Sequence, residues 1–124
     1  MAIDIASLTE KGEAVLRDFV TRNRLDGAIV ASAEGLEIVS YFTSDLDRDL
    51  LAADFASVLA GVEGLLNDSN KGELSEIIVK GENGYLAIVS LGENVVLGVL
   101  APTGQKLGVL IIAMQQLVKK LKSL

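Results

Sequence analysis

The stretch "DLLAADFASVLAGVEGLL", residues 49–66, constrains the fold most, because it predicts a helix with two apolar sides. Its large residues collect on one side, which predicts a helix covering a sheet; they are Leu51, Phe55, Val58, Leu59, Val62, Leu65 and Leu66. The opposite side is small, with Ala52, Ala56, Ala60 and Gly64 at i, i+4 spacing. An exposed helix side ordinarily carries Glu and Lys. The small side therefore predicts close contact with another backbone, the alternative being an exposed alanine-rich face.

Turn residues divide the rest of the chain into short elements. The predicted order is a helix from Ser7, strands at 27–32 and 36–42, a helix at 47–66, strands at 74–80, 85–91 and 95–101, and a helix from 104. Ser7 and Glu10 have the spacing of a helix-capping box. The separators "AEG", "GENG" and "GEN" are short and suit antiparallel connections.

This order predicts one α+β domain over residues 1–124, built on a five-stranded, mainly antiparallel sheet. The last two strands are apolar almost throughout instead of alternating. Such strands are typical of a sheet covered on both faces. Helices are therefore expected on both sides of the sheet.

Composition excludes several classes of function. The chain has no Cys and no His, which removes disulfides, thiol chemistry and the side chain most used for catalysis near neutral pH. Its net charge of −6 and few aromatic residues argue against nucleic acid as a partner. No uncharged apolar run approaches the ~20 residues of a membrane span. We expect a cytoplasmic protein without cofactor or metal and without membrane insertion.

The small side of the central helix predicts a homodimer. The first and last helices are needed on the far side of the sheet, so no helix of this chain remains to cover the small side. A two-fold axis would pair this side with its own copy, and "LSEIIVK" at the sheet edge with its symmetry mate. The candidate interface residues are Ala52, Ala53, Ala56, Ala60 and Gly64 on the helix and Ser75, Ile77 and Val79 on the strand.

Five blocks, in this order and spacing, resemble the Roadblock/LC7 domains: "LDGAIVASAEGLEIVSYF", "LLAADFASVLAGVEGLL", "GELSEIIVK", "GYLAIVSLGENVVLGVLA" and "GVLIIAMQQL". Within that family the chain is similar to the bacterial and archaeal members that resemble MglB. The resemblance implies a profilin-like α-β-β-α-β-β-β-α fold and a dimer, with itself or a paralogous Roadblock chain, joined through the central helix and third strand. It also implies a non-enzymatic regulator or scaffold that binds a Ras-like small GTPase.

Two questions stay open at the level of sequence. Arg48 is a candidate partner contact, either as an arginine finger or as a solvated charge balanced by Asp45, Asp47 and Asp49. Two alternative functions are a small-ligand sensor and a purely structural assembly subunit. A sensor would require a cavity where the apolar strands meet the last helix.

Overall fold

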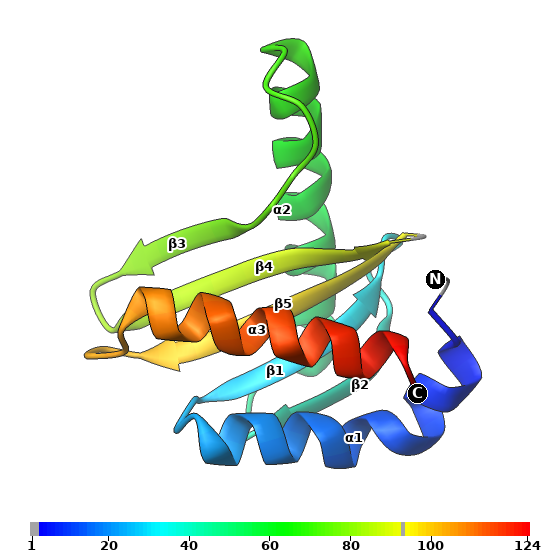
Figure 1. The fold of residues 1–124 in the computed structure, drawn as a ribbon, viewed down its shortest axis with the longest axis vertical. Coiled ribbons are helices and arrows are strands. Elements are labelled where there is room, and N and C mark those ends of the chain that lie inside the picture. The colour runs from blue at the N-terminus through cyan, green and yellow to red at the C-terminus, as the bar shows by residue number, and fades with distance from the viewer. Residues whose placement is uncertain (1–2, 93) are drawn as a thin grey trace.

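The computed structural model describes residues 3–92 and 94–124, which form one sheet between two layers of helices (Figure 1). The elements are α1 (Ile5–Arg22), β1 (Gly27–Ser32), β2 (Glu37–Phe42), α2 (Arg48–Asp68), β3 (Ile77–Gly81), β4 (Gly84–Gly92), β5 (Val95–Pro102) and α3 (Leu107–Lys122). The strands lie in the order β2-β1-β5-β4-β3, and each neighbouring pair is antiparallel. The predicted fold class is confirmed.

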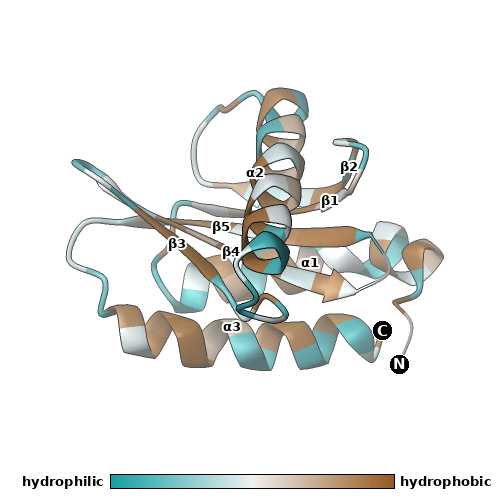
Figure 2. Cartoon of the chain, turned by 90° about the horizontal axis from the view of Figure 1, so that it is seen from above, coloured by the Kyte–Doolittle hydropathy of each residue, from teal (hydrophilic) through white to brown (hydrophobic). Residues whose placement is uncertain are grey.

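Helices α1 and α3 lie together on one face of the sheet, and α2 lies on the other (Figure 2). The core under α1 and α3 is the larger of the two, and it includes Leu8, Leu16, Val20, Leu97, Val99, Leu110 and Leu121. The core under α2 includes Ile29, Phe55, Leu59, Ile88 and Val96. Both faces of β5 are thus covered, as its continuous apolar sequence predicts.

Helix α2 runs across the strands instead of along them, and its C-terminal part continues past the β3 edge (Figure 1). The ring of Phe55 packs on the bare backbone of Gly98 in β5, where an added Cβ would lie 2.7 Å from two ring atoms. Absence of a side chain at Gly98 therefore lets α2 approach the middle of the sheet closely.

Two helix starts differ from the predictions. Asp4, not Ser7, caps α1: its carboxylate accepts hydrogen bonds from the backbone N–H groups of Ala6 and Ser7 and from the Ser7 hydroxyl. The bond from the Ser7 hydroxyl is the main reason that the pKa of Asp4 lies below its usual value. Helix α3 begins at Leu107, not near Gly104, because Gly104 has a φ of +90° and belongs to the preceding turn.

Replacing Gly98 with Ala should destabilise the fold, because the new methyl group would overlap the buried Phe55 ring. We expect the free energy of unfolding to fall by about 1–3 kcal/mol, the usual range for overpacking a core. Gly108→Ala is the control: it lies in α3 with no neighbour within 4 Å and should be neutral or stabilising. Denaturant unfolding measures both, and equal stability of the two variants would contradict the contact.

Candidate functional site

The β3 edge of the sheet has no strand beyond it among the described residues, since β3 hydrogen-bonds only to β4. A sheet edge of this kind presents unpaired backbone N–H and C=O groups that can pair with another chain. Ile77 and Val79, two of the predicted interface residues, lie in this strand. Ser75 precedes it in an exposed segment that the sequence analysis had assigned to the strand.

The C-terminal part of α2 has no sheet beneath it. The helix has 21 residues and at 1.5 Å per residue is about 30 Å long. Four gaps between five strands, at ~4.8 Å each, span only about 19 Å. Buried residues of α2 are accordingly confined to its N-terminal part, ending at Leu59. The remainder projects past β3 (Figure 1) and is called the overhang below, residues 60–68.

The predicted orientation of α2 is wrong for Ala52 and Ala56. These two residues are 0% and 5% exposed, and Ala52 belongs to the same buried cluster as Phe55 and Leu59. Two alanines on this side bring the helix close enough for Phe55 to reach Gly98. Ala52 and Ala56 are therefore unable to contact a second chain directly.

The other small residues predicted at the interface, Ala53, Ala60 and Gly64, are exposed along one flank of α2. Ala53 adjoins the β1–β2 turn, where a Cβ on Gly35 would lie 3.0 Å from the Ala53 Cα. Ala60 and Gly64 follow two and three helical turns later on the same flank. Both are exposed, and nothing lies within 4 Å of a Cβ placed on Gly64.

The opposite flank of α2 carries exposed large residues, Val58 and Leu65, which the sequence analysis had placed on the sheet. Leu65 is 66% exposed. The β3–β4 turn and the β1–β2 turn lie at opposite ends of the sheet. The flank with Val58 and Leu65 faces the end with the β3–β4 turn, whereas Ala53 lies beside the β1–β2 turn. On the same sheet face, Val79 of β3 is 41% exposed in line with Leu86 and Leu100. We call Val58, Leu65 and Val79 the α2–β3 surface.

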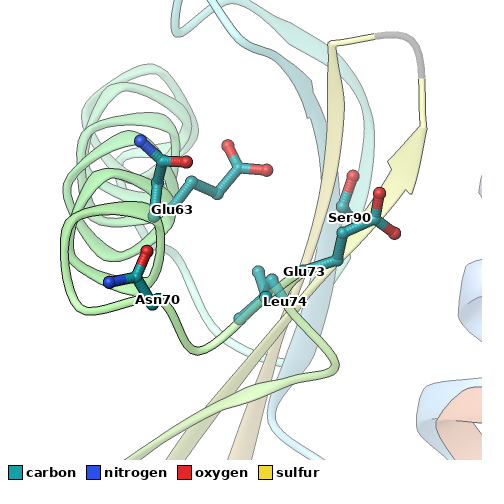
Figure 3. Close-up of a pocket in the computed structure, with 7 residues that line it drawn as sticks. Glu63, Asn70, Glu73, Leu74 and Ser90 are labelled. Carbon is teal, nitrogen blue, oxygen red and sulfur yellow. The ribbon is translucent and has the colours of Figure 1, made fainter.

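A polar hollow of about 730 Å³ lies between the end of α2 and the segment that leads to β3 (Figure 3). It is lined by Glu63, Asn67, Asn70, Gly72, Glu73, Leu74 and Ser90. In the described part of the chain, no group of three His, Cys, Asp or Glu residues is arranged to hold a metal ion. The hollow separates part of the overhang from the body of its own chain.

Arg48, at the start of α2, faces β2 instead of the neighbouring aspartates. Its Nη1 lies 3.6 Å from Oε2 of Glu37, and its Cζ lies 5.9 Å from the centroid of the Phe42 ring. Glu37 also accepts a hydrogen bond from the Ser40 hydroxyl. Among the described residues, the ion-pair partner of Arg48 is thus Glu37 and not Asp45, Asp47 or Asp49. Its side chain remains more than half exposed, at the opposite end of α2 from the overhang.

A ligand site of the sensor type would lie between the strands and α3. The side chains that meet there, including Leu97, Val99, Leu110 and Met114, are buried against one another. Space at this contact takes the form of an open groove at its margin, lined by residues of α3, β4 and the segment before β3. No helix in the described residues has the length and apolar character required to cross a bilayer.

The described residues thus form a five-stranded antiparallel sheet whose edge strands are β2 and β3, crossed by a helix that extends beyond the β3 edge. The chain belongs to the Roadblock/LC7 domain family, whose sequence profile matches residues 6–101. Members of this family are generally regulatory and not catalytic.

The chain is similar to individual proteins from archaea and bacteria. An uncharacterized protein of Methanocaldococcus jannaschii is 25% identical over 112 residues, which cover 90% of this chain and 97% of that protein. MglB of Myxococcus xanthus has a similar structure, with a TM-score of 0.86, 21% identity and coverage of 93% of this chain and 87% of its own. An MglB with a tetrameric arrangement has a TM-score of 0.83 at 18% identity, covering 93% and 88%. The two structures show a shared fold.

Gly64→Ala tests whether another backbone approaches the overhang. Within one chain the change should raise the free energy of unfolding by about 0.5–1 kcal/mol, because Ala is the better helix former and the site is open. Denaturant unfolding at several protein concentrations measures this. A loss of stability that grows with concentration would instead mean that a second chain packs closely against Gly64.

Proposed function

We propose that this protein is a dimeric regulator or scaffold for a Ras-like small GTPase. The dimer is proposed because two features lie next to each other: the free edge of β3, and the α2 overhang, which the rest of its own chain does not cover. The proposal keeps the cytoplasmic location expected from sequence. It assigns no catalytic residue to the chain.

A two-fold axis near β3 would satisfy both features at once. Antiparallel pairing of β3 with its copy would join the two sheets and use the open backbone groups of both edges. Each overhang would then extend over the other chain's sheet, toward Val79 and its neighbours. Val58 and Leu65 would be buried between the two α2 helices, and Ala60 and Gly64 would lie at the rim of the contact.

Support for self-association comes from one structural relative, an MglB with a tetrameric arrangement. A paralogous Roadblock chain could take the place of the second copy, since it would present the same edge and helix. The GTPase partner rests on the family, in which MglB-type members regulate GTPases. A dimer that binds no GTPase would instead be a structural assembly subunit.

The proposed mechanism is positioning of the GTPase's own groups. Hydrolysis of GTP needs an oriented water and stabilised charge, and both depend on ordered switch regions. A rigid surface built from two sheets and two helices can hold those regions in their productive arrangement. Arg48 is at most a contact here, because it is already engaged with Glu37 and Phe42.

Leu65→Arg should convert the dimer to a monomer, because it places a charge in the centre of the proposed contact. Ala60→Arg makes a similar change on the other flank and should weaken the dimer less. The matched control is Ala14→Arg, at an exposed position of α1 on the far face of the sheet. Light scattering over a dilution series gives the masses. A wild-type monomer at micromolar concentration would refute the dimer, and greater sensitivity to Ala60→Arg would move the contact to the small flank.

For the GTPase, the probe is a Ras-like small GTPase from the same genome, loaded with a non-hydrolysable GTP analogue or with GDP. We expect the dimer to bind the triphosphate form more tightly and Leu65→Arg to lose this preference. Arg48→Ala should reduce any stimulation of hydrolysis by less than about tenfold, whereas loss of an arginine finger costs about 10³–10⁵. Equal binding of both nucleotide states, or none, would contradict the regulatory role.

A further inference from the structure

A second surface, on the face opposite α2, has the form of a groove. It lies between α3 and the segment before β3 with the adjoining part of β4, and it has a volume of about 300 Å³. Ile111, Met114 and Val118 form its α3 wall and Val89 its floor. Ser75, Glu76, Ser90, Gln115 and Lys119 complete its lining. The groove is thus apolar along its length with polar groups at its rim.

Charge is distributed unevenly around this groove. Residues 103–124 contain four lysines and no acidic side chain, although the whole chain has a net charge of −6. Lys119, Lys120 and Lys122 lie in the last turn of α3. Among the ion pairs of the described residues, none engages these lysines. Glu76 is the carboxylate on the facing wall.

The outer surface of α3 is likewise apolar in its first half and basic in its second half. Val109 and Ile112, in its first half, are both 58% exposed, and Lys119 and Lys120 are exposed in its second half. Hydropathy changes accordingly from apolar to polar along α3 (Figure 2). Dipole complementarity explains cations at a helix C-terminus. It does not explain the exposed branched aliphatic residues ahead of them, which a water-facing helix would ordinarily replace with Glu, Lys or Gln.

We infer that this groove is a docking site for an acidic amphipathic helix of a partner protein. Ile111 and Val118 are seven residues apart, or about 10 Å along the helix. This matches apolar anchors at i, i+3 or i+4, and i+7 of a bound helix. Carboxylates beyond the last anchor would meet Lys119 and Lys122. At about 300 Å³ the groove is at the lower limit of small-molecule sites, which suits a few anchoring side chains.

The concave shape favours a helix over a membrane. An anionic bilayer attracts clusters of several lysines or arginines on an exposed surface, whereas Lys119 is the one lysine that lines this groove. The inference is independent of the proposed GTPase role, because the groove lies on the α1 and α3 side of the sheet. Ser75 is the one predicted dimer residue among the residues that line it.

The experiment is selection of 16-residue peptides from a random displayed library on the purified wild-type protein. We expect enriched peptides with apolar residues at helical spacing followed by Asp or Glu. Their dissociation constants, from fluorescence anisotropy, should rise at least tenfold for Val118→Glu and for Lys119→Glu. Lys119 is exposed, so its variant tests the site even if Val118→Glu impairs folding, which circular dichroism would reveal.

Two controls separate this site from the dimer. Leu65→Arg should leave peptide affinity within twofold, and Val118→Glu should leave the mass in light scattering unchanged. The inference is overturned if no acidic amphipathic sequence is enriched, or if the enriched peptides bind the Lys119→Glu variant as well as wild type. It is also overturned if phosphatidylglycerol vesicles bind at this surface and the peptides do not.

Discussion

The contact between Phe55 and Gly98 is the interaction on which the shape of this protein depends. Because β5 has no side chain at that point, α2 lies close to the middle of the sheet and across its strands. Phe55 is the eighth of the 21 residues of α2, so the helix extends past the outermost strand at its C-terminal end. The overhang follows from this packing arrangement, and the strand order places it beside the β3 edge.

The two faces of the sheet are covered by helices to different extents. On one face, α1 and α3 pack side by side and bury most of the core, which stabilises the chain. On the other, α2 alone covers part of the sheet and leaves apolar area at the β3 end. Exposed apolar area next to unpaired backbone groups is typical of surfaces that bind other proteins. This division fits a family whose members are generally regulatory and not catalytic.

Local sequence patterns predicted most of the fold. The hairpin at 27–32 and 36–42 and the boundaries of β4, β5 and α2 differ from the structure by at most two residues. Errors fell at helix starts and at β3. Asp4 lies outside the apolar pattern that marked Ser7, and residues 74–76 have strand-like sequence but no partner strand in this chain.

The sequence by itself determined the order of the elements, the need to cover both faces of the sheet and the absence of histidine and cysteine chemistry. Only the tertiary structure decided how α2 is rotated and where it lies over the sheet. Both sides of that helix are apolar, so periodicity gave no unique inward side. Its rotation depends on Gly98, more than 40 residues away in sequence, whose missing side chain admits Phe55 and so draws Ala52 and Ala56 inward. With the helix rotated in this way, Val58 and Leu65 are exposed.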